Sequence, residues 1–150
     1  MIFLTVGTAH FDPLVKAMDR LVEKGLLTER VVAQIGRGEY IPKNLEHFRY
    51  IQSLNKAYDF ADVIVSTGGA GTTIECVKRG LKLVVVENTT LMEGHQAQLI
   101  GEMAKRGHII WCRDVSTLYD CIQQARNHDF RPFVSDDPKV HHMILKLIRQ

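Results

Sequence analysis

The sequence has little cysteine and no long apolar run. Its three cysteines, Cys76, Cys112 and Cys121, form no C-x-x-C pair. An odd number of cysteines argues against a disulfide framework and favours a reducing, cytoplasmic environment. The apolar start, residues 1–7, lacks a basic leader and is much shorter than the roughly 20 residues that a membrane span needs. We therefore expect a soluble chain that reaches a membrane through a partner or an amphipathic surface.

The sequence also lacks an excess of charge of one sign. Its 19 Lys and Arg residues nearly balance its 17 Asp and Glu residues, and both kinds are spread along the chain. Nucleic-acid-binding domains usually carry a basic patch, so we expect no nucleic acid partner. The hydrophobic share of 45%, with only four prolines, is typical of a folded globular protein. A length of 150 residues suits one domain over residues 1–150.

Three nucleotide-related motifs are absent as well. The chain has no G-x-x-x-x-G-K-[ST], which disfavours a P-loop kinase or ATPase, and its first glycine turn is not the G-x-G-x-x-G of dinucleotide-binding folds. It also has no Asp-x-Asp pair to hold a metal ion against a sugar diphosphate. We therefore predict a site without metal or cofactor, in which backbone dipoles hold the leaving-group charge.

Short β-branched runs alternate with segments of helical periodicity. This alternation is typical of a parallel sheet with helices on both faces, so we predict an α/β, single Rossmann-like domain with about six strands. The predicted strands are 2–6, 31–35, 48–51, 63–65, 83–86 and 108–112. The predicted helices are 13–24, 53–59, 72–79, 93–106, 114–125 and 136–148, with glycines closing several of them.

Glycine-rich turns follow three of the predicted strands. In open parallel sheets, ligands bind outside the carboxyl ends of the strands, where these turns lie. The turns are Gly7–Thr8, residues 36–38, and residues 66–73 (Ser-Thr-Gly-Gly-Ala-Gly-Thr-Thr). The last one leads into a helix whose free N–H groups and positive end suit a diphosphate. The alternative is a tight turn that needs glycine only for a positive φ.

Two polar features accompany these turns. Glu75 falls in the first turn of the helix predicted from Thr72, where it either accepts hydrogen bonds from ribose hydroxyls or simply complements the helix dipole. The segment 87–98, after the fifth strand, is unusually polar and contains amide and imidazole groups that can grip sugar hydroxyls. Its alternative role is a polar helix start.

Several motifs together carry a family resemblance that covers most of the chain. They are residues 2–8 (Ile-Phe-Leu-Thr-Val-Gly-Thr), 11–15 (Phe-Asp-Pro-Leu-Val), 34–36 (Gln-Ile-Gly), 61–66 (Ala-Asp-Val-Ile-Val-Ser), 68–72 (Gly-Gly-Ala-Gly-Thr) with Glu75, and 91–96 (Leu-Met-Glu-Gly-His-Gln). The chain resembles the C-terminal, donor-binding domain of glycosyltransferase family 28, which is the C-terminal half of a GT-B fold. It departs from the family at Pro13, where arginine is expected.

The resemblance implies roles for individual residues. Glu75 is expected to bind the ribose of a uridine nucleotide, and the turns at Gly7 and Gly69 are expected to lie against its diphosphate. His95 and Gln96 are expected to reach the donor sugar. The full set of expected donor-binding residues is Gly7, Thr8, Gly68, Gly69, Ala70, Gly71, Thr72, Thr73, Glu75, Glu93, His95 and Gln96.

The resemblance also implies an activity. Stand-alone members include the small subunit of a two-subunit UDP-N-acetylglucosamine transferase of N-glycan assembly and bacterial exopolysaccharide and capsule relatives. We thus expect an inverting, UDP-sugar-dependent transferase subunit that moves a hexose-type sugar, such as N-acetylglucosamine, glucose or glucuronic acid, to a lipid-linked or polysaccharide acceptor. The resemblance also implies a membrane-anchored partner that supplies the acceptor half, so we expect the chain to work peripherally at the cytoplasmic face of the membrane.

Several alternatives stay open at this point. An inverting transfer needs a base, which either His10 or the partner provides. If the partner provides it, His10 has a buried or positioning role. The helix at 136–148 either packs on the core, docks the partner, or mediates self-association when the partner is absent. The whole chain is alternatively a non-catalytic nucleotide-sugar-binding module that regulates or scaffolds a separate transferase, or a flavodoxin-like module for another phosphate ligand.

Overall fold

The computed structural model describes residues 1–88, 94–132, 141–142 and 145. Within them, six parallel strands form one sheet in the order β3-β2-β1-β4-β5-β6. The predicted α/β class with a six-stranded parallel sheet is confirmed. The strands are β1 (Ile2–Thr5), β2 (Val31–Gln34), β3 (Glu46–Phe48), β4 (Val63–Ser66), β5 (Leu83–Val86) and β6 (Ile110–Cys112).

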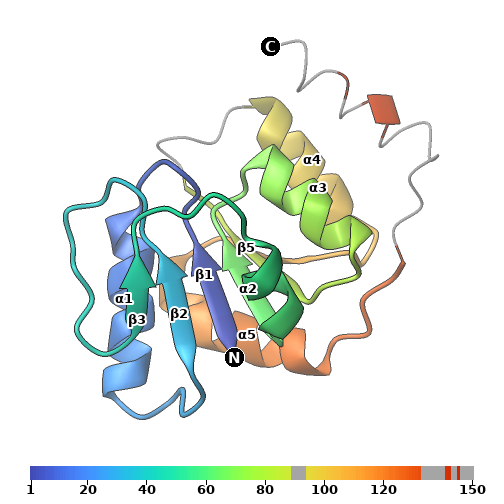
Figure 1. The fold of residues 1–150 in the computed structure, drawn as a ribbon. Coiled ribbons are helices and arrows are strands. Elements are labelled where there is room, and N and C mark those ends of the chain that lie inside the picture. Colours follow the sequence, from blue (N-terminus) through green and yellow to red (C-terminus); the bar gives the residue numbers. More distant parts are fainter. Residues whose placement is uncertain (89–93, 133–140, 143–144, 146–150) are drawn as a thin grey trace.

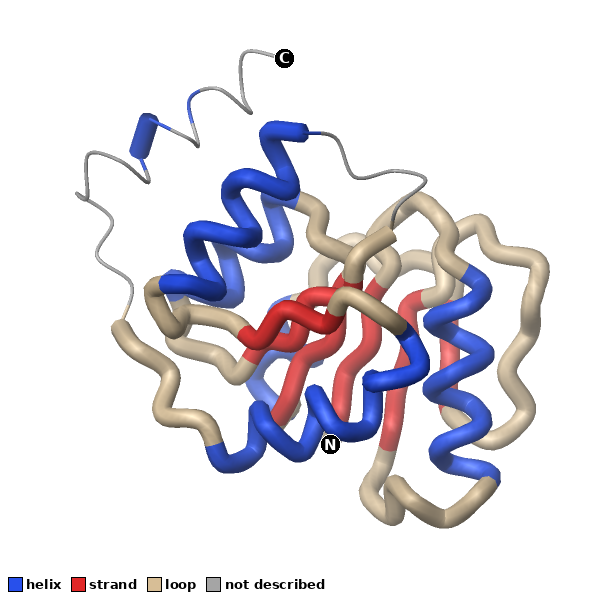
Figure 2. The backbone as a smooth tube through the Cα atoms, turned by 180° about the vertical axis from the view of Figure 1, so that it is seen from behind, coloured by secondary structure: helices blue, strands red, loops and turns tan. Residues whose placement is uncertain are grey.

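Helices cover both faces of the sheet, as Figures 1 and 2 show from opposite sides. On one face lie α1 (Asp12–Glu23) and α5 (Leu118–Asn127), which is preceded by a short 3-10 helix (Val115–Thr117). On the other face lie α2 (Asn55–Phe60), α3 (Ala70–Lys78) and α4 (Gly94–Lys105).

The two faces are built by alternate side chains of the same strands. Ile2 and Leu4 belong to the buried cluster under α1 and α5, whereas Phe3 between them belongs to the cluster under α2, α3 and α4. Successive strand residues point to opposite faces. Because both faces are covered, apolar residues fill the central strands without the alternation of a half-exposed sheet, and this is the pattern from which the fold is predicted.

Two predicted boundaries are wrong in an informative way. The third predicted strand covers 48–51, but β3 spans Glu46–Phe48, and Tyr50 and Ile51 are exposed beyond it. A short strand at the edge of the sheet is not marked by an apolar run, because little of it is buried. The helix after β4 is predicted to start at Thr72, but α3 starts at Ala70.

Helix ends follow the expected chemistry. Gly25, Gly80 and Gly107 each follow a predicted helix and adopt a positive φ of 74°, 70° and 81°. Asp114, at the start of the helix predicted over 114–125, accepts a hydrogen bond from the Ser116 N–H at 2.9 Å. The helix predicted at 136–148 lies outside the described residues, apart from 141–142 and 145.

Candidate functional site

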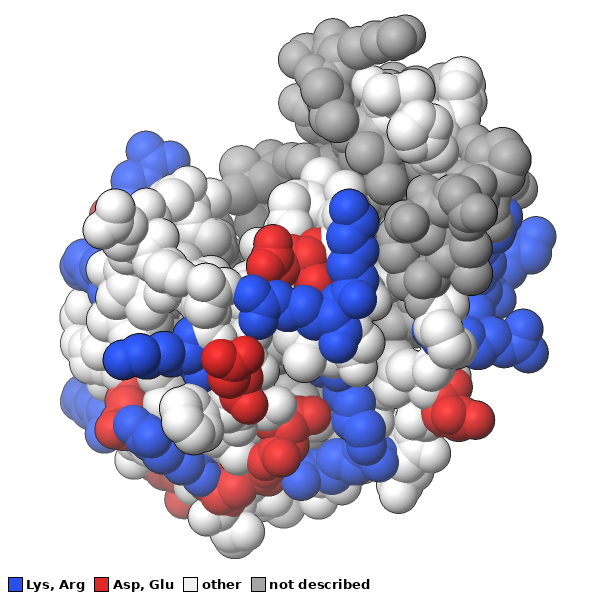
Figure 3. Space-filling view, turned by 45° about the vertical axis from the view of Figure 1, so that its right-hand side comes forward, with Lys and Arg blue, Asp and Glu red and all other residues white. Residues whose placement is uncertain are grey.

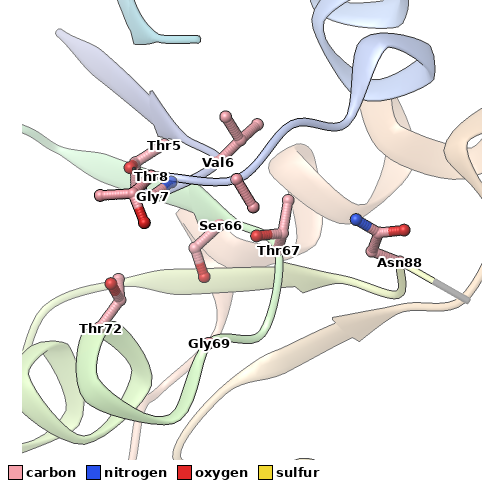
Figure 4. Close-up of a pocket in the computed structure, with 10 residues that line it drawn as sticks. Thr5, Val6, Gly7, Thr8, Ser66, Thr67, Gly69, Thr72 and Asn88 are labelled. Atoms are coloured by element: carbon pink, nitrogen blue, oxygen red, sulfur yellow. Dashed lines mark hydrogen bonds between the residues drawn. The ribbon is translucent and has the colours of Figure 1, made fainter. Parts of the chain in front are cut away.

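The strand order creates a crevice between β1 and β4. The chain leaves β1 for α1 on one face and leaves β4 for α3 on the other, so the loops diverge at the carboxyl ends of these neighbouring strands. Such a point is where open α/β sheets bind ligands. A cavity of about 270 Å³, here called the switch-point pocket, lies there (Figure 4). It is lined by Thr5, Val6, Gly7, Thr8, Ala9, Ser66, Thr67, Gly69, Thr72 and Asn88.

The turn after β1 is fixed by a buried amide. Gly7 has a φ of 67°, and its N–H donates to Thr5 Oγ1 at 3.0 Å. The Gln34 Nε2 group, from β2, donates to the Gly7 carbonyl at 3.0 Å and to Thr5 Oγ1 at 3.2 Å. These bonds hold the Gly7–Thr8 turn against the mouth of the pocket.

The glycine turn after β2, residues 36–38, packs against the loop that follows β1. Gly36 has a φ of 61°, and a Cβ atom there would lie 2.0 Å from the Ala9 carbonyl oxygen. The Arg37 N–H donates to that same oxygen at 2.9 Å, and the Arg49 guanidinium donates to the Gly36 carbonyl at 3.0 Å. This turn contributes no residue to the pocket lining, so its glycine serves close backbone packing.

The start of α3 forms the opposite wall. The first N–H groups of a helix have no intrahelical acceptor, and the helix end carries a positive partial charge. Gly69 and Thr72 line the pocket, whereas Thr73 is fully buried and its hydroxyl donates to the Gly69 carbonyl at 2.9 Å. Gly68, with a φ of 84°, makes the turn, and neither it nor Ala70 is among the lining residues.

A second, more open cavity of about 390 Å³ adjoins the first. It is here called the lateral pocket, and Thr72 lines both cavities. Glu75 stands on its wall with a side chain that is 48% exposed, and it accepts a hydrogen bond from Arg79 Nε at 3.1 Å. The lining residues of the lateral pocket are Gln52, Ser53, Leu54, Asn55, Tyr58, Gly71, Thr72 and Glu75.

The earlier start of α3 corrects the setting of Glu75. The sequence predicts Glu75 in the first helical turn, but α3 begins at Ala70, so Glu75 lies in the second turn. The helix dipole acts mainly within the first turn, so an interaction with the dipole does not explain why a glutamate stands at this position. Arg79 instead orients it, and the same guanidinium donates to Asn55 Oδ1 at 2.6 Å.

Tyr58 forms the buried side of the lateral pocket. It is 5% exposed, and the Arg79 guanidinium lies 5.3 Å from the centre of its ring. Burial raises the pKa of Tyr58 to about 12, and a hydrogen bond with Thr72 opposes this rise. The phenol is therefore protonated near neutral pH and can act as a hydrogen-bond donor.

His10 lies beside the switch-point pocket and not in its lining. Its side chain is exposed, so the alternative of a buried histidine is wrong. Its backbone carbonyl accepts a hydrogen bond from Asn88 Nδ2 at 3.4 Å, and Asn88 is buried within the lining. The loop after β1 is thus tied to the end of β5.

The structure brings together only part of the predicted set. Gly7, Thr8, Gly69 and Thr72 line the switch-point pocket, and Gly71, Thr72 and Glu75 line the lateral one. Glu93 lies outside the described residues. The backbone of His95 and Gln96 lies in the first turn of α4, and their side chains are outside the described part.

The expected set of donor-binding residues leaves out several residues that line the switch-point pocket, although the turn 66–73 and the polar segment 87–98 were singled out as segments. Thr5 and Ser66 end strands β1 and β4, Thr67 follows Ser66, and Asn88 follows β5. A signal for them exists in the sequence: each is a polar residue at or just past the carboxyl end of an otherwise apolar strand. This signal identifies a site only once the strand order is known, because the strand order decides which of these polar residues lie side by side.

The described part of the chain adds three negative observations. It contains no group of three or more His, Cys, Asp or Glu side chains that could hold a metal ion. None of its helices has the length and apolarity that a membrane crossing requires. On the face shown in Figure 3, basic and acidic side chains of the described residues are interspersed and form no patch of one sign.

Comparisons with solved structures support the fold. The structure matches an NMR structure of ALG13 with a TM-score of 0.63 and 18% identity, covering 99% of this chain and 96% of that one. It also matches MurG of Acinetobacter baumannii with a TM-score of 0.64 and 20% identity, covering 99% of this chain and 49% of that one. At such identities the likeness concerns the fold alone.

Sequence comparisons go further. A UDP-N-acetylglucosamine transferase subunit ALG13 of Homo sapiens is 38% identical over 137 residues, which cover 84% of this chain and 12% of the relative. A UDP-N-acetylglucosamine–N-acetylmuramyl-(pentapeptide) pyrophosphoryl-undecaprenol N-acetylglucosamine transferase of Finegoldia magna is 32% identical, with 86% of this chain and 39% of the relative covered. The model of the glycosyltransferase family 28 C-terminal domain matches residues 1–137. This chain therefore belongs to the glycosyltransferase family 28 C-terminal domain family.

Proposed function

We propose that this chain is the donor-binding subunit of a UDP-sugar-dependent glycosyltransferase. The observation that carries the proposal is the pair of pockets that adjoin at Thr72. A nucleoside diphosphate has a matching shape, with a nucleoside at one end and a diphosphate at the other. The names of the human and bacterial relatives make UDP-N-acetylglucosamine the first donor to test, ahead of UDP-glucose and UDP-glucuronic acid.

The diphosphate belongs in the switch-point pocket. Gly69, the N-cap residue of α3, and the Gly7–Thr8 turn face this cavity from two sides. Helix N-termini bind phosphate through N–H groups and the positive helix end, without a metal ion. The same groups stabilise the charge that develops on the UDP leaving group during transfer.

The nucleoside belongs in the lateral pocket. Glu75 is half-exposed there, and a carboxylate can accept hydrogen bonds from both ribose hydroxyls. Arg79 Nε donates to the Oε1 atom of this carboxylate at 3.1 Å, and the other oxygen is proposed to accept from the ribose. Glu93, His95 and Gln96 are proposed to contact the donor sugar.

The transfer step requires groups beyond the two pockets. The acceptor hydroxyl attacks the anomeric carbon as UDP departs from the opposite side, so the configuration inverts, and a base takes the acceptor proton. His10, exposed beside the switch-point pocket, is the candidate base of this chain. A membrane-anchored partner subunit is proposed to bind the lipid-linked or polysaccharide acceptor and to hold the chain at the cytoplasmic face of the membrane.

Binding of UDP by calorimetry tests the donor site, with Glu75→Gln as the variant. We expect the affinity for UDP to fall about tenfold, because a hydrogen bond to a charged group is lost. Asp59→Asn is the matched control, since Asp59 also pairs with Arg79, at 3.4 Å, but lines neither pocket. Failure of the wild-type chain to bind UDP would reject the proposal.

A transfer assay tests the catalytic part. The chain is co-expressed with a membrane-anchored subunit that carries the acceptor half, and product formation from UDP-N-acetylglucosamine is measured. Transfer that requires both subunits supports the proposal, and loss of transfer without loss of UDP binding in His10→Gln supports the base. UDP binding without transfer in the presence of a competent partner favours the non-catalytic module instead.

A further inference from the structure

A row of buried polar side chains crosses the carboxyl ends of three neighbouring strands. Gln34 on β2 and Ser66 on β4 are both register partners of Thr5 on β1. All three residues are at most 2% exposed. They lie on the sheet face that α2, α3 and α4 cover, since Phe3, two residues before Thr5, packs there. Polar groups at such depth normally have hydrogen-bond partners.

Two atoms of this row depart from the rule, namely Gln34 Oε1 and the Ser66 hydroxyl, and of these two residues Ser66 lines the switch-point pocket. Its Oγ atom is buried and has no hydrogen-bond partner in the described part of the chain. Ser66 lines the switch-point pocket, and Figure 4 shows its hydroxyl in the space between the Gly7–Thr8 turn and the start of α3. A buried hydroxyl without a partner destabilises the ligand-free protein. This cost is removed if a ligand in the pocket accepts the hydrogen bond.

Thr5 presents a second hydroxyl at the same place. Its Oγ1 atom accepts two hydrogen bonds, from the Gly7 N–H at 3.0 Å and from Gln34 Nε2 at 3.2 Å. A hydroxyl accepts two bonds and donates one, so both lone pairs are used and the hydrogen remains to be donated. Thr5 also lines the pocket, so the amide of Gln34 fixes Thr5 as a donor toward it.

The chemistry of the pocket indicates which ligand group these hydroxyls meet. Among the described lining residues there is no Lys, Arg, Asp or Glu. Without carboxylates the pocket does not suit a cation, and without Lys or Arg an anion there depends on neutral donors. The hydroxyls of Thr5 and Ser66 rise from the sheet, while the positive end of α3 forms the wall. An acceptor-rich anion such as phosphate matches both.

We propose that Ser66 and Thr5 form a floor of the switch-point pocket that donates hydrogen bonds to phosphate oxygens of the nucleotide, and that Gln34 is a positioning residue for Thr5. This inference rests on the proposed donor function and adds a second phosphate-binding surface to it. The turns at Gly7 and Gly69 hold the diphosphate from the sides, and the strand ends hold it from below.

Ser66→Ala tests the floor through two readouts. We expect the affinity for UDP, measured by calorimetry, to fall about tenfold while the affinity for uridine stays unchanged, because only UDP carries phosphate. The melting temperature of the ligand-free variant is expected to equal or exceed that of the wild type, because the unpaired hydroxyl is gone. Ser116→Ala, which removes an exposed serine hydroxyl outside both pockets, is the matched control.

Gln34→Met tests the positioning role with a side chain of similar length. It is expected to weaken UDP binding less than Ser66→Ala does and to leave uridine binding unchanged. Wild-type affinity for UDP in Ser66→Ala, while the wild type binds UDP, would overturn the floor and leave the donor function standing. An equal loss for UDP and uridine would also overturn it, since that result indicates general damage. A wild-type chain that binds no UDP removes the donor function and the floor together.

Discussion

Gly36 shows how a single residue away from the pocket lining shapes the pocket. Its φ of 61° lies in the left-handed region, and its Cα faces the Ala9 carbonyl oxygen at a distance that leaves no room for a Cβ atom. Ala9 itself lines the switch-point pocket. Any side chain at position 36 would therefore push the loop after β1 toward the space that we assign to the diphosphate.

We predict that Gly36→Ala lowers the free energy of unfolding by about 3 kcal/mol, from the left-handed backbone and the clash together. Gly25→Ala is the matched control, because Gly25 has a φ of 74° but no atom lies within 4 Å of the position that its Cβ would take. That control should lose only about 1 kcal/mol. Urea denaturation measures both values, and equal losses would contradict the role of the Ala9 contact.

Among the elements, α1 holds the long loop between β2 and β3 through two acidic residues. Asp19 is 2% exposed and accepts hydrogen bonds from the Tyr40 hydroxyl, from the Lys43 N–H at 3.1 Å and from the Asn44 N–H at 2.8 Å. Asp12, two turns earlier on the same helix, accepts from the backbone of the same loop. The loop is thereby fixed to the helix that starts beside the pocket.

Asp19 predicts a pH dependence of stability. Burial raises its pKa, but the hydrogen bonds from Tyr40, Lys43 and Asn44 outweigh burial and lower the pKa below the ordinary 3.8. The folded state thus favours the ionised carboxylate. Its contribution to stability is present above pH 3.8, the value in the unfolded chain, and is lost as the pH falls through the lower folded-state pKa.

We expect Asp19→Asn to lower the free energy of unfolding by about 2 kcal/mol at neutral pH, since two backbone N–H groups and a phenol lose a charged acceptor. The difference from the wild type should shrink once the pH falls below 3.8. Urea denaturation across this pH range measures it. Asp120→Asn, at an exposed position on α5, is the control. If the stability difference between Asp19→Asn and the wild type did not change with pH, the role of the ionised Asp19 carboxylate would be contradicted.

For the molecule as a whole, ligand binding and stability are linked. A ligand that binds only the folded chain raises the free energy of unfolding, by about 2.7 kcal/mol at a concentration of 100 times its Kd. Because backbone dipoles and hydroxyls are proposed to hold the diphosphate, we predict that UDP stabilises the chain equally in EDTA and in Mg²⁺. Thermal unfolding with both additions measures this, and stabilisation that appears only with Mg²⁺ would contradict a metal-independent site.

The alternation of the sequence was sufficient for most of the architecture. Strands β1, β2, β4 and β5 are buried on both faces, so their apolar runs coincide with the strands themselves. The edge strand β3 was predicted with the wrong bounds, because its residues are largely exposed and the apolar residues nearby, Tyr50 and Ile51, lie outside it. The extra helical residues at the start of α3 were missed because glycine-rich segments carry weak helical signals.

The residues of the site also fall into a part that the sequence predicted and a part that it did not. Gly7, Gly69, Thr72 and Glu75 could be predicted because a glycine-rich turn and the helix after it are neighbours in sequence, so their chemistry is local. The Gln34–Thr5–Ser66 row could not, because its members are brought together only by the pairing of β1 with β2 and β4. The sequence by itself determined the elements and the family, since periodicity and motifs are local. Only the tertiary structure decided which strand ends meet, because strand order depends on packing between distant segments.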